Sequence, residues 1–239
     1  MNKPLKDILL WMFFTNHCRY CNKIIDKGEV LCYECANKIP VIEEEKCKYC
    51  GVEKSRCSCK KHRMNYDGIS APFYYDEGIR ECIHLLKFSG KDFLARHLAE
   101  DMAKSVQDDF KGIDFDFICY VPFSRMNKIT RRYNPSELLA KHLSKVLDLS
   151  LNPVLIKLFE NENQRNLNII ERTGNVFGVY DIRDGVDVKD KTILLVDDVK
   201  TTGATLNNCA SILKIRGAKR VCCVTAAISV SKKAENQEK

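Results

Sequence analysis

The sequence predicts an α/β protein in which a parallel sheet flanked by helices follows a small, metal-bearing N-terminal module. Three observations support this fold class. Short apolar runs alternate with amphipathic helical segments over most of the chain after residue 66. One of these runs ends in two carboxylates and a loop rich in hydroxyl groups, within 193–205. Eight cysteines fall in close pairs before residue 60, which is typical of metal ligands.

The composition indicates a folded chain and sets few limits on function. With 239 residues, the chain has room for one α/β domain of about 150 residues and a small module. No apolar run approaches the ~20 residues that span a bilayer. The apolar run 8–14 is not followed by the small residues of a signal-peptide cleavage site. We therefore expect a cytoplasmic protein, and the net charge of +7 does not by itself indicate nucleic acid binding.

The cysteine pairs predict two structural zinc ions. Three pairs are CxxC and the last has one intervening residue: Cys18 and Cys21, Cys32 and Cys35, Cys47 and Cys50, Cys57 and Cys59. Two such pairs complete a closed tetrahedral site. Sequential and interleaved pairings both fit the spacing, and the short last pair lets His62 compete as a ligand. The other cysteines (Cys82, Cys119, Cys209, Cys222 and Cys223) lie in apolar segments, where we expect free buried thiols.

The chain is expected to divide into an N-terminal helix and zinc module (1–63), an α/β domain (64–231) and a disordered tail (232–239). The helix, over 5–14, either docks on the protein or lies on a membrane surface, so a peripheral position at the inner face of the membrane stays open. In the domain, the pattern predicts strands over 71–75, 115–121, 154–158, 193–196 and 221–230, and helices over 78–88, 92–106, 135 onward and 206–216. Asn134 and Pro135 are typical of a helix start, and Gly217 of a left-handed helix end.

The segment 193–205 predicts a site for a sugar phosphate. Its acids, Asp197 and Asp198, follow the most apolar strand, and open α/β sheets hold ligands at that end. The loop and helix start after them offer free N–H groups and hydroxyls that suit a phosphate: Thr201, Thr202, Gly203, Ala204 and Thr205. Carboxylates would repel the phosphate, so we assign them to neutral hydroxyls such as those of ribose. The predicted ligand is a ribose 5-phosphate.

Two further segments are candidates for the same site. The loop 122–134 carries four cations and no acid, which suits an anion such as diphosphate better than a purely structural role, although a solvated basic loop is the alternative. We assign Ser124, Arg125 and Arg132 of this loop to diphosphate. The polar stretch 159–178 is either a lid, which would bring Arg172 to the substrate, or a disordered excursion.

The segment 193–205 resembles the phosphoribosyl diphosphate (PRPP) signature of type I phosphoribosyltransferases. The whole arrangement resembles the competence protein F family (ComF, with the ComFC and GntX proteins), in which a double zinc ribbon precedes a phosphoribosyltransferase-type domain. The marks of the resemblance are the CxxC pairs, Lys87-Phe88-x-Gly90, Val121-Pro122, Arg132-Tyr133-Asn134, Gln164-x2-Leu167, Glu171-Arg172-x2-Asn175 and the central motif. The family commonly has Gly where Arg132 stands and Gln where Pro135 stands.

The resemblance implies a type I phosphoribosyltransferase-like fold, PRPP binding with Mg²⁺, and a cytoplasmic role in natural transformation. There the protein would help to bring single-stranded DNA across the inner membrane with a partner helicase. Two functions stay open. One is a PRPP-binding DNA-uptake protein that handles DNA or the helicase through its zinc module and basic loop. The other is an active phosphoribosyltransferase with an unidentified acceptor and unassigned catalytic residues. Tyr20, Tyr33 and Tyr49, beside the cysteine pairs, either stack on DNA bases or pack the module.

Overall fold

The computed structural model describes residues 16–26, 29, 31–43, 45–57, 59, 64–89, 92–123, 133–158 and 179–230. Several predictions lie outside the described residues. These are the N-terminal helix over 5–14, the ligand alternative His62, the loop residues Ser124, Arg125 and Arg132, the lid with Arg172, and the tail over 232–239.

A five-stranded parallel sheet forms the centre of the molecule. Its strands follow the order β3 (Gly68–Ser70), β9 (Arg220–Ile228), β8 (Thr192–Lys200) and β5 (Phe117–Tyr120), and β4 (Phe73–Tyr74) pairs with the far end of β9. All of these pairings are parallel. The first five residues of β8 and the last eight of β9 are buried, which explains why both strands are almost continuously apolar.

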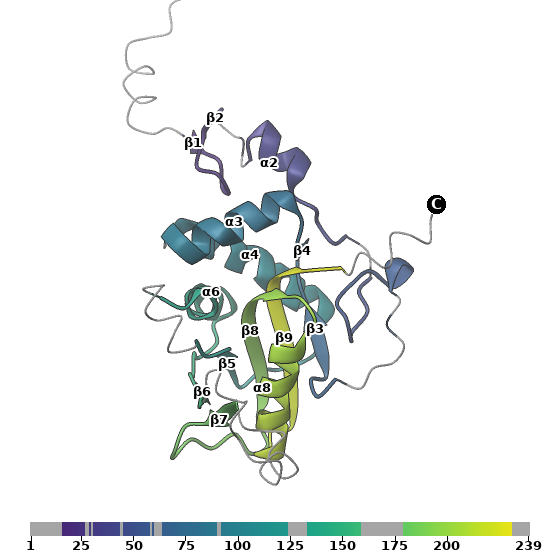
Figure 1. Ribbon diagram of the computed structural model, residues 1–239, viewed down its shortest axis with the longest axis vertical. Coiled ribbons are helices and arrows are strands. Elements are labelled where there is room, and N and C mark those ends of the chain that lie inside the picture. Colours follow the sequence, from purple (N-terminus) through teal and green to yellow (C-terminus); the bar gives the residue numbers. More distant parts are fainter. Residues whose placement is uncertain are drawn as a thin grey trace, which may run out of the picture.

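Helices cover both faces of the sheet. One face packs against α3 (Glu77–Ser89), α4 (Asp92–Asp109) and α6 (Pro135–Leu147), and the other against α8 (Ala204–Ile215) and the antiparallel pair β6 (Leu155–Lys157) and β7 (Tyr180–Ile182). Successive residues of β8 divide between the faces, because Leu194 and Val196 belong to the first core and Ile193 and Leu195 to the second. Figure 1 shows α8 lying along the sheet and α3 beyond its upper end.

The predicted helix signals are confirmed where the structure describes them. The Asn134 side chain accepts a hydrogen bond from the Ser136 N–H at 3.1 Å, and Pro135 opens α6. Gly217 follows α8 with φ of +96°, the left-handed conformation expected of a terminating glycine. Two strands differ from the prediction in extent. β8 continues through the acids to Lys200, and the strand expected over 71–75 is replaced by β3 and β4, interrupted at Pro72 because proline has no N–H for the ladder.

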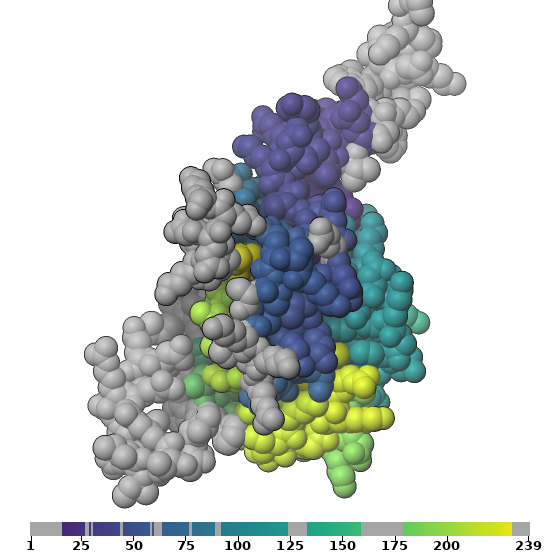
Figure 2. Space-filling model, turned by 90° about the vertical axis from the view of Figure 1, so that its right-hand side faces the viewer, coloured from purple at the N-terminus to yellow at the C-terminus, as the bar shows by residue number. Residues whose placement is uncertain are grey.

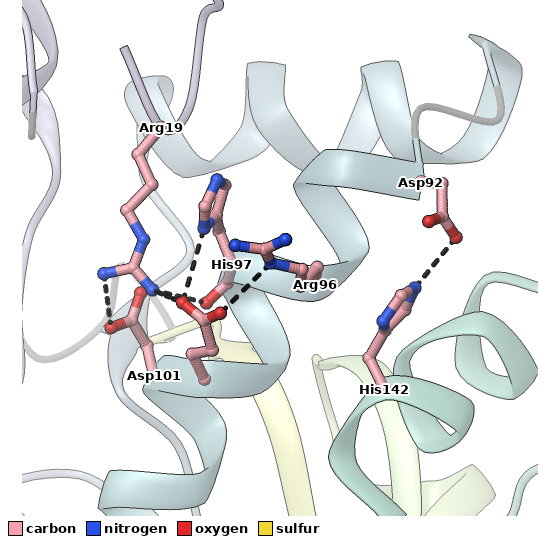
Figure 3. Close-up of polar contacts among 7 residues, drawn as sticks. Arg19, Asp92, Arg96, His97, Asp101 and His142 are labelled. Carbon is pink, nitrogen blue, oxygen red and sulfur yellow. Dashed lines mark hydrogen bonds and ion pairs between the residues drawn. The ribbon is translucent and has the colours of Figure 1, made fainter. Parts of the chain in front are cut away.

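The first ribbon, the described part of 16–38, docks on the helical layer through its own small core residues. It contains β1 (Asn16–His17), β2 (Ile24–Ile25) and α2 (Tyr33–Lys38). Cys18, Tyr20 and Ile25 are buried in the same core as α3 and α4. Arg19 lies 2.5 Å from Glu100 and 3.5 Å from Asp101 on α4, and the Tyr20 hydroxyl donates to Asp101. Figure 3 shows the Arg19 side chain reaching Asp101.

The second ribbon, the described part of 45–59, docks at the edge of the sheet. It contains the 3-10 helix η1 (Lys54–Arg56). Val52 and Ile42 share a small core with Ala71, Tyr74 and Ile228 at the ends of β4 and β9. Figure 2 shows the two ribbons, in purple and blue, running one after the other down this side of the molecule. Because their buried side chains pack on the domain, neither ribbon builds a core independently of it.

No described helix combines the length and the apolar character that crossing a membrane requires.

We predict that Gly51→Ala destabilises the protein more than Gly112→Ala. Both glycines have positive φ, +75° and +76°, so both variants strain the backbone by about 1 kcal/mol. A Cβ at Gly51 would also lie 2.2 Å from Ile228 Cδ1, whereas nothing lies within 4 Å of one at Gly112. The clash should add about 1–3 kcal/mol to the loss at Gly51. Denaturant unfolding of the zinc-loaded variants measures both losses, and equal losses would show that the second ribbon is not packed on β9.

Candidate functional site

The two predicted acids lie near the carboxyl end of β8, at the edge of the sheet where the helical layer ends. Asp197 is held by two hydrogen bonds to its Oδ1 atom. The Ser136 hydroxyl, at the start of α6, donates to it at 2.8 Å, and the Asp198 N–H donates at 2.9 Å. These contacts fix the Asp197 side chain beside the first turn of α6.

Asp198 forms an ion pair with a residue that sequence reasoning did not place in the site. The Nζ atom of Lys87, in the last turn of α3, lies 2.7 Å from Asp198 Oδ2. The two side chains are only 22% and 16% exposed, so water screens the pair less than it screens a surface ion pair. Lys87 had been noted as a mark of the family resemblance, but no local pattern gave it a role. No local pattern gave Ser136 a role either, because Ser136 and Asp197 are 61 residues apart in the sequence.

The environment of Asp197 makes its carboxyl difficult to ionise. Burial and the neighbouring charge of Asp198 raise the pKa of Asp197 from 3.8 to about 7. The hydrogen bonds from Ser136 and from the Asp198 N–H, together with the positive charge of Lys87, act in the opposite direction. Ionisation of both carboxyls at once is therefore unfavourable unless a cation or a hydroxyl-bearing ligand compensates their negative charge.

The loop after the acids presents its polar groups to solvent. The side chains of Thr201, Thr202 and Thr205 are exposed, and so is Ala204. Gly203 is buried and is the N-cap residue of α8, with φ of +81°, and it has no side chain with which to cap the helix. The Ala204 N–H donates to Thr202 Oγ1 at 3.3 Å. The first turn of α8, a helix of 12 residues, thus offers N–H groups to an anion.

The ends of the basic loop meet beside the acid pair. Val121 N–H donates to Val196 O at 2.9 Å, which sets the start of the loop next to β8. Asn134, which caps α6, also donates from Nδ2 to Val121 O at 3.0 Å and so ties the end of the loop to its beginning. The ends of 159–178 are also close together, because Leu158 N–H donates to Val179 O at 2.9 Å.

The paired cysteines gather into two separate clusters. One contains Cys18, Cys21, Cys32 and Cys35, and the other contains Cys47, Cys50, Cys57 and Cys59, with the ligand atoms of each cluster within 4.8 Å of one another. The structure therefore has the sequential arrangement of the two that the spacing allowed. Sulfur separations of 3.6 Å (Cys21 to Cys32) and 3.5 Å (Cys47 to Cys59) are near the ~3.8 Å edge of a tetrahedral zinc–thiolate site.

The remaining cysteines are free and buried, which confirms their prediction as core thiols: Cys82, Cys119, Cys209, Cys222 and Cys223. They take no part in either cluster.

Two known protein families match separate parts of the chain. Residues 9–65 match the double zinc ribbon domain, and residues 134–239 match the phosphoribosyl transferase domain. The fold and the site thus define a protein in which a double zinc ribbon precedes a type I phosphoribosyltransferase-like sheet. The ribbon match and the two cysteine clusters together support structural zinc.

Curated relatives extend over most of the chain. Competence protein F of Haemophilus influenzae is 28% identical over 221 residues, which cover 87% of this chain and 95% of that protein. Competence protein ComFC of Streptococcus pneumoniae is 29% identical, over 80% of this chain and 84% of that protein. ComFC of Bacillus subtilis is 24% identical, over 81% and 82% respectively. The presence of both domains in this order, together with these relatives, supports assignment of the chain to the ComF family.

Solved structures similar to this chain include an adenine phosphoribosyltransferase, with a TM-score of 0.41 and 14% identity over 63% of this chain and 78% of that one.

We predict that Asp197 makes the wild-type protein less stable as the pH rises from about 5.5 to about 7.5. With its pKa raised to about 7, the folded protein keeps a proton that the unfolded chain has released, so the free energy of unfolding falls with rising pH. Asp197→Asn removes this dependence because an amide does not titrate in this pH range. Its amide oxygen still accepts both hydrogen bonds, so the contacts of the site are kept. Relative to that variant, the wild type should lose about 1–2 kcal/mol.

Denaturant unfolding of zinc-loaded protein at several pH values measures this difference. Both proteins carry the same cysteine clusters, so the pH dependence of zinc binding is common to both. Asp114→Asn, which changes an exposed acid before β5, serves as the control and should follow the wild type. A constant difference between wild type and Asp197→Asn over the whole pH range would contradict the prediction.

Proposed function

We propose that this protein binds PRPP together with Mg²⁺ through the carboxyl end of β8 and the start of α8. The observation that carries the proposal is that two carboxylates and a helix start with glycine at its N-cap lie in one continuous strand–loop–helix unit. A phosphorylated sugar has the matching groups, because its phosphate suits the helix start and its hydroxyls suit the carboxylates.

Each part of the ligand has candidate partners in this unit. The 5-phosphate would bind the N–H groups of Gly203, Ala204 and Thr205 and the hydroxyls of Thr201, Thr202 and Thr205. The ribose hydroxyls would donate hydrogen bonds to Asp197 and Asp198. The diphosphate would bind Ser124, Arg125 and Arg132, and the position of the loop ends at Val121 and Asn134 supports this assignment. Arg172 would approach from the lid.

Mg²⁺ would contribute positive charge between the diphosphate and the acid pair. Magnesium takes oxygen ligands and commonly uses one or two carboxylates with substrate phosphates. Asp197 and Asp198 supply carboxylate oxygens at the right edge of the sheet, and the raised pKa of Asp197 shows that the pair tolerates little uncompensated negative charge. Lys87 would then share the neutralising role with the metal, since its ammonium already lies on Asp198.

At the level of the cell, we propose a cytoplasmic role in competence and DNA uptake. The support is that the curated relatives are named competence proteins and cover at least 80% of the chain. The ribbons would handle single-stranded DNA or a helicase partner. Of the three tyrosines beside the cysteine pairs, Tyr33 fits this role, because it is 84% exposed. Tyr20 is only 2% exposed and packs in the core. An exposed aromatic ring on a ribbon suits base stacking.

We predict that Asp197→Ala abolishes calorimetric binding of PRPP in the presence of Mg²⁺. The variant removes an acceptor for the ribose hydroxyls and leaves Ser136 without its partner. Zinc content should stay at two ions per chain, because both cysteine clusters lie outside this unit. Asp114→Ala, the matched control at the amino end of β5, should bind as the wild type does. Wild-type affinity in Asp197→Ala would refute the assignment, and omission of Mg²⁺ tests the metal separately.

We predict that Tyr33→Ala weakens binding of single-stranded DNA by about tenfold, because stacking of one base contributes about 1–3 kcal/mol. Ile24→Ala is the matched control, since Ile24 is 58% exposed on the same ribbon but has no aromatic face. Fluorescence anisotropy with a labelled oligonucleotide, repeated at several salt concentrations, measures the effect. Similar affinities for Tyr33→Ala and the wild type would show that the first ribbon does not stack on DNA.

A further inference from the structure

Lys200, the last residue of β8, is an unusual residue for its position. Its side chain is only 7% exposed, and lysine is almost never buried to this extent unless it is paired with a negative charge. It stands in register with Ile228 at the end of β9, and its carbonyl accepts a hydrogen bond from Ser229 N–H at 2.8 Å. The chain therefore fixes the backbone of Lys200 firmly, while its ammonium needs a partner.

The negative charges that act on Lys200 come from the second cysteine cluster. The thiolates that favour the charged form of the Lys200 ammonium are those of Cys47, Cys50 and Cys59, and they oppose the lowering of its pKa by burial. A zinc ion bound by four thiolates carries a net charge of −2. Zinc bound at the second cluster would therefore also favour the charged form of Lys200.

The same cluster is attached to the sheet by its backbone. Tyr49, inside the Cys47–Cys50 pair, accepts a hydrogen bond at its carbonyl from the Tyr66 hydroxyl at 2.8 Å. The next carbonyl back, that of Lys48, accepts from the Ile69 N–H at 3.0 Å. These two bonds hold the turn of the zinc ribbon against β3.

Lys200 and Tyr66 also touch the turn that forms the predicted phosphate site. A Cβ built at Gly203 would lie 3.3 Å from Lys200 Cε and 3.7 Å from the Tyr66 hydroxyl oxygen. One side chain layer, made of Lys200 and Tyr66, therefore separates the cysteine cluster from the Gly203 turn. Gly203 needs its left-handed conformation to aim the first N–H groups of α8 outward.

We propose that the second zinc ribbon supports the Gly203 turn. Lys200 and Tyr66 are the positioning residues that couple zinc occupancy to the conformation of the phosphate site. When the second cluster loses its zinc, the ribbon turn that carries Tyr49 loosens, and with it the support that Tyr66 gives to the Gly203 turn. The consequence for PRPP rests on the proposed function. Since coupling between two sites is reciprocal, bound PRPP would slow zinc loss from the second cluster.

The first ribbon provides an internal comparison. Its described polar anchors reach α4, through Arg19 to Glu100 and Tyr20 to Asp101, and not the Gly203 turn. Zinc at the first cluster should therefore stabilise its own ribbon without changing the phosphate site.

The test uses the full-length, zinc-loaded protein and three variants. Lys200→Met removes the charge and keeps a chain of similar length, Tyr66→Phe removes the bond to Tyr49, and Tyr20→Phe is the matched control in the first ribbon. Amide hydrogen exchange is followed by mass spectrometry in peptides that cover 199–208 and α4. We expect about tenfold faster exchange in 199–208 for Lys200→Met and Tyr66→Phe, with the first half of α4 (92–101), where the first ribbon docks, unchanged, and no change in 199–208 for Tyr20→Phe.

Two further measurements separate coupling from general destabilisation. Zinc transfer to a chromogenic chelator should show one phase that is accelerated about tenfold by Lys200→Met and slowed by PRPP, and one phase that neither affects. Calorimetry should show PRPP affinity about tenfold weaker in both variants. If Lys200→Met does not fold, Tyr66→Phe decides the outcome by the same measurements.

The outcomes distinguish this inference from the proposed function. Unchanged exchange over 199–208 in both variants would overturn the coupling, even if PRPP binds. A wild type that does not bind PRPP would refute the proposed function, and the exchange and chelator results would still decide whether the second zinc cluster supports the Gly203 turn.

Discussion

Two adjacent carboxylates lie at the end of a buried strand, and the groups around the site are arranged to compensate their charge. Asp197 and Asp198 repel each other, and burial makes ionisation of Asp197 costly, so its pKa is raised to about 7. The fold offsets this cost with groups from different elements, since Lys87 comes from α3 and Ser136 from α6. These contacts require the end of α3 and the start of α6 to converge on one edge of the sheet. The same edge receives the ends of the basic loop through Asn134, so the groups suited to a phosphorylated sugar gather there for an electrostatic reason.

The zinc ribbons obey a different constraint, which is their small size. Segments this short bury too little apolar surface to fold alone, so metal binding must supply much of the folding free energy and a neighbouring surface must complete the core. The first ribbon completes its core on α3 and α4, and the second on the ends of β4 and β9. The second choice has a consequence for the site. The ends of β8 and β9 are also where the Gly203 turn begins, so the ribbon and the turn share a boundary.

The comparison of sequence with structure shows which contacts local patterns can predict. The acids, the hydroxyl-rich loop and Gly203 are contiguous, and together they need only a strand, a turn and a helix, so their arrangement followed from 193–205 alone. The helix start at Asn134 and the end at Gly217 were predictable for the same reason. Lys87 and Ser136 were missed because their roles exist only after distant helices converge on β8. The pairing of cysteines was undecided because the spacing of the four pairs suits either pairing, and only the folded ribbons separate the clusters. Assignments to Arg125, Arg132 and Arg172 stay predictions.

Lys200 connects the two constraints. An apolar side chain could be buried at the end of β8 without a compensating charge, as Val196 is four residues earlier. It would not require the second ribbon. Burial lowers the pKa of Lys200, and the thiolates of the second cluster oppose this shift. Lys200, two residues after the acid pair, is thus favoured when the second ribbon is assembled with its metal. In this way a module without its own core acquires influence over the site, because the site's supporting strand carries a charge that the module alone neutralises among the residues that the structure describes.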